Sequence, residues 1–290
     1  MSKQRVAIIG LGLMGSGMAG RLLSEKFPLT VYNRNPEKAA SLAQAGAKVA
    51  GSPREAGANS DVVISIVADD AASRAVWLGE NGALTGAASG AVLIESGTLK
   101  VGWIKELAAA AATHGCELLD APVTGTKPHA ASGQLRFLVG GSAAALEMAR
   151  PVLSVLGNEI VHLGPTGSGA LMKLINNFVC GVQLASIAEA VSLMSAGGLD
   201  RDQALAVLTS GAPGSPLVKT ASARAISGDP TINFFLRLMA KDISYAMAEG
   251  AARGVPMQTA AAGLAVYQHA IDAGRGDEDL SAIIGSVEQT

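Results

Sequence analysis

The sequence contains few of the residues that mark disulfide-bonded, metal-binding or nucleic-acid-binding proteins. Only two cysteines, Cys116 and Cys180, occur among 290 residues, so we expect neither a disulfide framework nor a CxxC zinc site. The four histidines lie far apart and form no HExxH pattern, and we expect no metal site. The formal net charge is −2, so no basic excess favours binding to nucleic acid.

Long apolar runs and a targeting segment are also absent. Gly, Asn, Ser or Lys interrupts each apolar run before the length of about 18 residues that a membrane span needs, so we expect no membrane association. We also expect no signal peptide, and therefore a cytoplasmic location. Apolar residues still make up 49% of the chain, which favours a globular protein with a sizeable core. The length allows one large domain or two.

Short, continuously apolar runs alternate with helical patterns in the first half. Such runs are typical of buried strands in a parallel sheet that has helices on both faces. The predicted strands span 6–9, 29–32, 62–67, 92–94, 117–119 and 135–139, and the first two predicted helices span 15–25 and 36–45.

The pattern changes near residue 165, after which strand-like runs almost disappear. Apolar spacing from 170 to 196 is helical over an unusual length. Further helices are predicted at 201–209, 216–226, 235–253, 256–272 and 277–287. We therefore predict an α/β protein with a doubly wound parallel sheet in residues 1–165 and an all-α domain in residues 166–290.

A GxGxxG motif lies between the first strand and the first helix. This context predicts a dinucleotide-binding Rossmann turn, in which the pyrophosphate meets the helix N-terminus. The alternative is a merely tight turn. The predicted cofactor loop comprises Gly10, Leu11, Gly12, Leu13, Met14 and Gly15.

The second strand ends in Asn33 and Arg34 rather than in Asp or Glu. A carboxylate there would bind the ribose of NAD, whereas a guanidinium can pair with the 2′-phosphate of NADP. Lys38, one turn later, would add positive charge. We therefore predict NADP(H); the alternative is that Arg34 is a solvated surface residue.

The next two strands should end at the same crevice, where ligands of open α/β sheets bind. The backbone of Val67 and Ala68 is predicted to touch the cofactor, and Thr98 to reach the nicotinamide ribose. For Asp69 and Asp70 we favour solvation or helix capping over chemistry.

Carbonyl reduction needs a proton donor for the oxygen that receives charge. Lys173 lies in a strongly apolar helical pattern, and Asn177, four residues later, shares its face. Burial would lower the pKa of this lysine and make it a workable acid. The alternative is a lysine whose stem covers apolar surface while its amine stays in water.

Two further segments carry polar groups that suit the same chemistry. The loop at 120–126, with sequence DAPVTGT, presents backbone amides and hydroxyls that suit a carboxylate; alone it is equally a tight turn. Lys241 and Asp242 share a predicted helix, where an ordinary exposed charge pair is the alternative.

Together these segments resemble the β-hydroxyacid dehydrogenase family over nearly the whole chain. The similarity includes GLGLMGSGMAGRLL (10–23), which resembles the cofactor signature, and DAPVTG (120–125), which resembles the substrate loop. It also includes GSGALMKLINN (167–177), which resembles the catalytic helix, and FFLRLMAKDISYA (234–246), which resembles the FxxxLxxKDL segment.

The resemblance implies a role for each matching residue. Lys173 would be the general acid in reduction, and Asn177 would hold the substrate or orient that lysine. The carboxylate would bind to Thr124, Gly125 and Thr126, and Lys241 would lie near the nicotinamide. The family fold joins its two domains by a long helix, and its members usually form homodimers or homotetramers.

Within the family, TGTKPHAASGQL (124–135) is closer to the NADPH-dependent glyoxylate/succinic semialdehyde reductases than to the hydroxyisobutyrate branch. Pro128 and His129 depart from that branch's pattern. We predict NADPH-dependent reduction of small carboxylate-bearing aldehydes to hydroxy acids. The alternatives are a 3-hydroxyacid dehydrogenase that uses NAD(P), and a non-catalytic NADPH-binding module.

Overall fold

The computed structural model describes residues 3–286 and divides into two compact units. The first contains residues up to Lys173 and the second begins at Leu174, so the division lies inside one long helix. The sequence pattern placed the domain boundary at 165/166, just before that helix begins. Each unit is described separately below.

The first unit is built on a sheet in the order β3-β2-β1-β4-β5-β6-β8-β7, with β9 paired to β8. The run from β3 to β6 is parallel and has the strand order of a Rossmann fold. Carboxyl ends of these strands therefore meet at one edge. The strands are β1 (Val6–Ile9), β2 (Leu29–Tyr32), β3 (Lys48–Val49), β4 (Val62–Ser65), β5 (Val92–Glu95), β6 (Glu117–Asp120), β7 (Val123–Thr124), β8 (Leu135–Gly140) and β9 (Gly157–Gly164).

The sheet is parallel from β3 to β6, as the sequence predicts, and becomes mixed at its other end. Strand β8 runs antiparallel to β6 and β7 and parallel to β9. Only a short helix separates β7 from β8, and a connection of this length suits an antiparallel return rather than a crossover. The sheet is therefore mixed.

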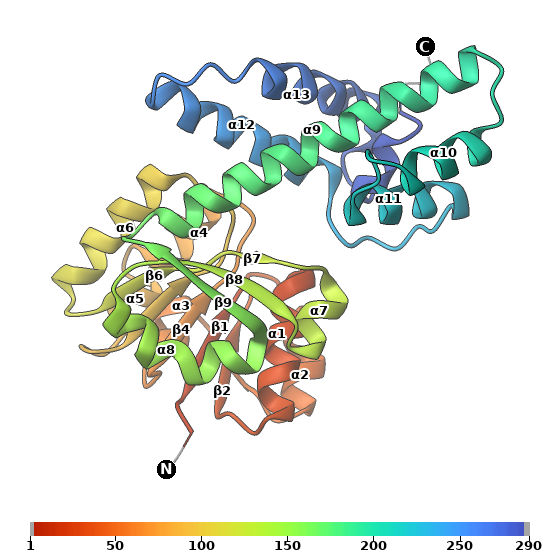
Figure 1. Cartoon of the computed structure of the whole chain (residues 1–290). Coiled ribbons are helices and arrows are strands. Elements are labelled where there is room, and N and C mark those ends of the chain that lie inside the picture. The colour runs from red at the N-terminus through yellow and green to blue at the C-terminus, as the bar shows by residue number, and fades with distance from the viewer. Residues whose placement is uncertain (1–2, 287–290) are drawn as a thin grey trace. The chain divides into compact units, whose positions relative to one another are not determined.

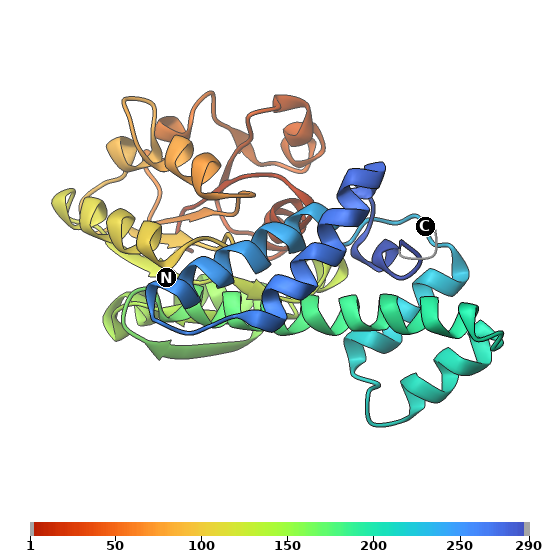
Figure 2. The same ribbon diagram turned by 90° about the horizontal axis from the view of Figure 1, so that it is seen from above.

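Helices lie on both faces of the sheet (Figures 1 and 2). One core joins β1 and β8 to helices α1, α7 and α8 through buried side chains such as Ile8, Met18, Ala130, Phe137 and Leu153. The helices are α1 (Leu13–Ser24), a 3₁₀ turn η1 (Pro36–Ala39), α2 (Ala40–Gln44), α3 (Pro53–Gly57), α4 (Asp70–Trp77), α5 (Ala83–Gly86), α6 (Val101–Thr113), α7 (Lys127–Ser132) and α8 (Ala143–Leu156).

The second unit is helical, as the sequence predicts. Its core collects buried side chains from α9 and the later helices, including Leu184, Val191, Leu205, Ile243 and Tyr267. Helices α12 and α13 run side by side (Figure 2). The elements are α9 (Ser168–Ala196), which starts in the first unit, α10 (Arg201–Ser210), α11 (Pro216–Ser227), α12 (Leu236–Ala252), α13 (Gln258–Ala270), a π-helical turn η2 (Ile271–Arg275) and a 3₁₀ turn η3 (Leu280–Ile283).

The predicted helix at 277–287 is wrong within the described residues. Only the turn η3 forms there, and Asp279 bridges instead to Phe235. The carboxylate of Asp279 accepts the backbone N–H groups of Asn233 and Phe234 at 2.7 and 3.2 Å. These tertiary bonds replace the helical pattern.

Helix α9 is long and apolar enough to pass for a membrane span by length and composition, with a mean hydropathy of 1.5 over the best window. The argument from interrupted apolar runs did not anticipate this, because scattered polar residues barely lower the average. Buried residues such as Leu184, Ala188 and Val191 place the same helix in the core of the second unit. Core helices commonly pass this test.

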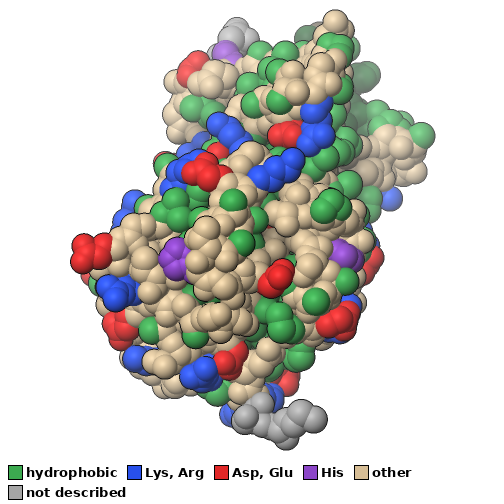
Figure 3. Space-filling model, turned by 90° about the vertical axis from the view of Figure 1, so that its left-hand side faces the viewer, with side chains coloured by type: hydrophobic (Ala, Val, Ile, Leu, Met, Phe, Trp, Pro, Cys, Tyr) green, Lys and Arg blue, Asp and Glu red, His purple; other side chains and the backbone are tan. Residues whose placement is uncertain are grey.

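Charged side chains are interspersed on the face shown in Figure 3, where lysine and arginine occur among aspartate and glutamate. Among the described residues, exposed ion pairs include Arg74 with Glu106 and Arg136 with Glu159. Exposed pairs of this kind contribute little to stability.

Candidate functional site

The glycine loop has the geometry of a dinucleotide-binding turn. Gly10 has a φ of +100°, and a Cβ there would lie 2.4 Å from the carbonyl oxygen of Ile66. A Cβ on Gly15 would lie 1.9 Å from the carbonyl oxygen of Gly10, whereas one on Gly12 would meet nothing within 4 Å. Helix α1 begins after Gly12 without a side-chain cap. The loop is thus tightly packed against the protein at Gly10 and Gly15, and it leaves free space at Gly12. This arrangement suits a pyrophosphate bound at the helix N-terminus.

Asn33 ties this loop to the end of β2. Its Oδ1 accepts the N–H of Leu11 at 2.9 Å, and its Nδ2 donates to the carbonyl oxygen of Asn35 at 2.8 Å. Asn33 therefore positions the loop with both ends of its amide. Arg34 and Lys38 are exposed beside it, so their charged ends are accessible to a ligand.

The ends of β4 and β5 lie close together, as the sequence predicts. Val67 contacts the glycine loop, since a Cβ on Gly10 would lie 3.1 Å from its Cγ1. Asp69 caps α4 by accepting the N–H of Ala72 at 2.8 Å, and Asp70 accepts the N–H of Lys100 at 3.1 Å. Both carboxylates thus have structural roles, while Ala68 is exposed and Thr98 half-buried.

Glu95, at the end of β5, is a buried carboxyl that sequence reasoning missed. Its Oε2 accepts from Ser73 Oγ and Trp77 Nε1, each at 2.7 Å, and its Oε1 accepts the N–H of Gly97 at 2.8 Å. Burial raises the pKa of Glu95, although these hydrogen bonds oppose the rise. The network fixes the start of the loop that contains Thr98. An acidic residue that ends an otherwise apolar strand was the available signal.

We expect Glu95→Gln to lower the free energy of unfolding by about 1–3 kcal/mol. The Nε2 of glutamine is a donor, and it would face a buried donor that now bonds to the carboxylate. A raised pKa means that the native state binds this proton at a higher pH than the unfolded chain does. Its stabilising contribution is complete below the ordinary pKa and is lost as the pH rises through the raised value. The difference in the free energy of unfolding between the unmodified protein and Glu95→Gln should therefore become smaller as the pH rises. Denaturant titrations at several pH values would measure it.

Glu106→Gln is the matched control, because Glu106 is exposed and bonded to Arg74. Its effect should stay within about 0.5 kcal/mol. Equal effects of the two substitutions would contradict the assignment of Glu95 as a buried structural acid.

Asp120, at the end of β6, holds the beginning of helix α9. Its two carboxylate oxygens accept the N–H groups of Gly167 and Ala170, each at 2.8 Å. It is fully buried, and burial raises its pKa against the effect of these bonds. A Cβ on Gly169 would lie 2.5 Å from the carbonyl oxygen of Asp120. The N-terminus of α9 therefore packs closely against the end of β6 and is capped by Asp120, a residue far away in the sequence.

The substrate loop predicted from the sequence comes directly after Asp120 in the chain. Thr124 is half-buried, whereas Gly125 and Thr126 are exposed, and Gly125 has a φ of +133°. Thr126 is engaged within the protein: its N–H donates to His129 Nδ1 at 3.1 Å, and its Oγ1 lies 2.7 Å from the same nitrogen. Sequence reasoning noted His129 only as a departure from a family pattern.

Lys173 is half-buried and lies three residues beyond Ala170 on α9. Because Asp120 fixes Ala170, it also sets the position of the turn that carries Lys173. The alternative, a lysine whose stem covers apolar surface while its amine stays in water, also gives a half-buried side chain, so half-burial does not distinguish the two interpretations.

Asn177, Asp242 and Lys241 form one polar cluster in the helical unit. Asn177 Nδ2 donates to Asp242 Oδ2 at 2.6 Å, and Lys241 Nζ lies 2.7 Å from Asp242 Oδ1. Asn177 and Asp242 are 4% and 1% exposed, so a buried carboxylate links the other two side chains. Lys241 also lies over the ring of Tyr245, 4.5 Å from its centre. The exposed-pair alternative for Lys241 and Asp242 is wrong.

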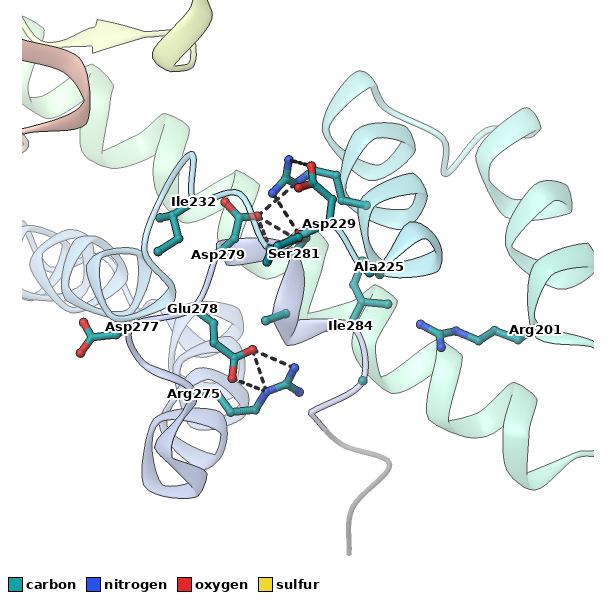
Figure 4. Close-up of a pocket in the computed structure, with 15 residues that line it drawn as sticks. Arg201, Ala225, Asp229, Ile232, Arg275, Asp277, Glu278, Asp279, Ser281 and Ile284 are labelled. Carbon is teal, nitrogen blue, oxygen red and sulfur yellow. Dashed lines mark hydrogen bonds and ion pairs between the residues drawn. The ribbon is translucent and has the colours of Figure 1, made fainter. Parts of the chain in front are cut away.

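The pocket drawn in Figure 4 is separate from these residues. It has a volume of about 550 Å³ and lies between α10, α11 and the η2–η3 segment. Two ion pairs lie within its lining: Arg275 with Glu278 at 3.1 Å, and Arg224 with Asp229 at 2.6 Å. None of the predicted site residues lines it, and we assign these two pairs to holding chain segments together.

Across residues 3–286, no group of three or more His, Cys, Asp or Glu side chains is arranged to hold a metal ion. The polar groups described above are instead amides, hydroxyls, lysines and capped carboxylates. They suit an organic anion and a nucleotide cofactor.

Comparison with known families covers almost the whole chain. Residues 5–164 match the family described as the NAD binding domain of 6-phosphogluconate dehydrogenase. Residues 167–287 match the family described as NAD-binding of NADP-dependent 3-hydroxyisobutyrate dehydrogenase. The two matches meet between residues 164 and 167.

Individual relatives agree with this pattern. The chain is 35% identical to 3-sulfolactaldehyde reductase of Escherichia coli, over 97% of this chain and 95% of the relative. It is 34% identical to the chloroplastic glyoxylate/succinic semialdehyde reductase 2 of Arabidopsis thaliana, over 98% of this chain and 79% of the relative. The structure is similar to that of 3-hydroxyisobutyrate dehydrogenase from Salmonella typhimurium, with a TM-score of 0.89, 30% identity and coverage of 97% and 99%. The chain therefore belongs to the 3-hydroxyisobutyrate dehydrogenase-like β-hydroxyacid dehydrogenases, a family of oxidoreductases that act on CH–OH groups.

Proposed function

We propose that this protein reduces small aldehydes that carry a carboxylate, with glyoxylate and succinic semialdehyde as the first substrates to test, and uses NADPH. The observation that carries the proposal is the position of Asp120. This residue caps the helix of Lys173 and begins the segment that leads to Thr124 and Gly125. One strand end thus fixes both a proton donor and a loop suited to a carboxylate.

Each group has a separate chemical task in this proposal. NADPH supplies a hydride to the aldehyde carbon when it is bound. Lys173 donates a proton to the carbonyl oxygen as that oxygen gains charge. Asn177, held by Asp242, orients the substrate, and Lys241 provides positive charge for the cofactor.

The loop after β6 is the proposed binding site for the substrate carboxylate. The N–H of Gly125 has no hydrogen-bond partner among the described residues, and Thr124 adds a hydroxyl next to it. A backbone amide beside a hydroxyl suits one carboxylate oxygen.

Arg34 and Lys38 support the choice of NADPH. Both are exposed next to the glycine loop, at the end of the strand where an acidic residue would instead accept from the ribose of NAD. The backbone of Val67 and Ala68, the hydroxyl of Thr98 and the open amides after Gly12 complete the proposed cofactor contacts.

A 3-hydroxyacid dehydrogenase is the second candidate. It is favoured by the match of residues 167–287 to the hydroxyisobutyrate dehydrogenase family and by the similarity to the Salmonella enzyme. Such an enzyme would oxidise a hydroxy acid with NAD(P)⁺, and Lys173 would then remove the proton.

Initial rates of NADPH and NADH oxidation distinguish the two candidates. The panel comprises glyoxylate, succinic semialdehyde, tartronate semialdehyde and methylmalonate semialdehyde. We expect fast turnover of the first two with NADPH. Preference for NADH and a branched three-carbon semialdehyde would instead support the hydroxyisobutyrate assignment.

Replacing Arg34 by aspartate should reverse the cofactor preference. A carboxylate repels the 2′-phosphate of NADPH and accepts from the ribose of NADH, so the ratio of kcat/KM values should change by about 10–100-fold. Arg136→Asp is the control, because Arg136 is an exposed arginine on β8 paired with Glu159. An unchanged ratio in Arg34→Asp would leave Arg34 as a surface residue.

We also propose a cytoplasmic homodimer or homotetramer that is not associated with membranes or nucleic acid. Exposed apolar residues at helical spacing on α9, including Ile175, Val179 and Leu193, support self-association. Sedimentation of the purified protein would give the number of subunits.

A further inference from the structure

His129 and Thr126 form a closed hydrogen-bonded pair at the edge of the substrate loop. They are the N3 and N-cap residues of α7 and face each other in a capping box. The N–H of Thr126 donates to His129 Nδ1 at 3.1 Å, and Thr126 Oγ1 lies 2.7 Å from the same nitrogen. The side chain of Thr126 in turn accepts the backbone N–H of His129, which completes the box.

The helix that carries His129 is itself firmly placed. Helix α7 packs directly on α1, because a Cβ on Gly17 would lie 3.0 Å from Ala130 Cβ and from the backbone nitrogen of Ala131. Pro128 lies in the first turn of α7, where the lack of an N–H is tolerated. His129 thus holds Thr126 from a helix fixed to the glycine-loop helix.

The pair changes what the loop offers to a ligand. The amide of Thr126 is bonded to His129 Nδ1, whereas the N–H of Gly125 makes no hydrogen bond to the described residues. His129 also lies close to Gly125, since a Cβ built on Gly125 would be 3.2 Å from His129 Cβ. The Gly125 amide and the Thr124 hydroxyl are therefore the groups that this loop offers to a ligand.

We infer that His129 is a positioning residue that sets the specificity of the loop, by holding the amide of Thr126 so that one small carboxylate fits between Thr124 and Gly125. This inference rests on the proposed function, because it assumes that the loop binds the substrate carboxylate. His129 acts through Thr126 and does not touch the reacting atoms. It therefore affects substrate affinity rather than proton transfer.

Steady-state kinetics of two variants test this role. His129→Ala removes the acceptor, and a lost cap should raise KM for glyoxylate about five- to tenfold while kcat changes less than about twofold. His129→Gln restores an acceptor at the N3 position, where glutamine is an ordinary partner in a capping box. It should return KM to within about twofold of the unmodified enzyme. His114→Ala, at the exposed end of α6, is the control and should change neither parameter.

Two measurements that do not monitor turnover separate this inference from the proposed function. Solvent exchange of the Thr126 amide proton, followed by NMR, should be slow in the unmodified protein and in His129→Gln and fast in His129→Ala. Equilibrium titration of the NADP⁺ complex with glycolate should follow the same pattern. The unmodified protein and His129→Gln should bind glycolate tightly, and His129→Ala should bind it weakly. An inactive unmodified enzyme that still gives both patterns would refute only the proposed reaction.

The inference is overturned by any of three results from the variants. The first is a Thr126 amide that exchanges equally fast in all variants. The second is a His129→Ala enzyme that loses kcat with KM unchanged, and the third is a failure of His129→Gln to restore glycolate binding. Unmodified protein that binds no glycolate would also overturn it, because the loop would then not be a carboxylate site.

Discussion

Lys173→Met is expected to reduce kcat for aldehyde reduction by about 10²–10⁴-fold, the usual contribution of a positioned general acid. Methionine has a similar length and high helix propensity, so the apolar helix α9 should form normally. The thioether cannot donate a proton to the carbonyl oxygen. Affinity for NADPH should be retained, because the proposed cofactor contacts lie on the glycine loop and the strand ends.

The measurement is initial-rate NADPH oxidation with glyoxylate, together with NADPH binding by fluorescence titration. Lys219→Met is the matched control, since Lys219 is an exposed lysine on helix α11. It should retain full activity. A Lys173→Met enzyme with more than a tenth of the original kcat would remove Lys173 from its proposed role.

Asp120→Ala should be the most destabilising of the substitutions considered. Two buried N–H groups, of Gly167 and Ala170, would lose their acceptor at once. Each unsatisfied donor costs about 1–3 kcal/mol, so we expect a loss of about 2–6 kcal/mol in the free energy of unfolding. Because Lys173 follows on the same helix, kcat should also fall about tenfold through misplacement.

Thermal and denaturant unfolding of Asp120→Ala, with kinetics at a temperature where it is folded, test this expectation. Asp200→Ala is a matched helix-cap control, since Asp200 accepts a single amide, that of Gln203, at 2.8 Å. An ordinary lost cap costs about 1 kcal/mol, and kcat should not change. If both variants lose the same stability and activity, Asp120 has no special part in holding α9.

Local patterns predicted the residues whose role depends on their immediate neighbours. The parallel run of strands and the long helix α9 follow from spacing and apolar content, and the structure confirms them. Gly10 and Gly15 are required by contacts within one turn and the adjacent strand end, which the motif already encodes.

The sequence could not predict pairings between distant segments. Asp120 bonds to residues about 50 positions later, and Asn177 bonds to Asp242. The reversal of β8 likewise depends on which neighbours the strand finds in three dimensions. Thr126 illustrates a subtler limit: its residue type suits a carboxylate, but the bond from its N–H to His129 is visible only in the structure.

The cluster around Glu95 contains the residues responsible for the intrinsic tryptophan fluorescence of the protein. The chain has two tryptophans, and both belong to this cluster: Trp77 donates to Glu95, and Trp103 donates to Ser73 at 2.9 Å. Arg74 lies 4.0 Å from the centre of the Trp103 ring. Emission excited at the tryptophan band therefore originates in the sheet unit alone, beneath the loop that contains Thr98. Its wavelength and quenching would follow events at that loop without any added label, while the helical unit stays spectroscopically silent at the same excitation.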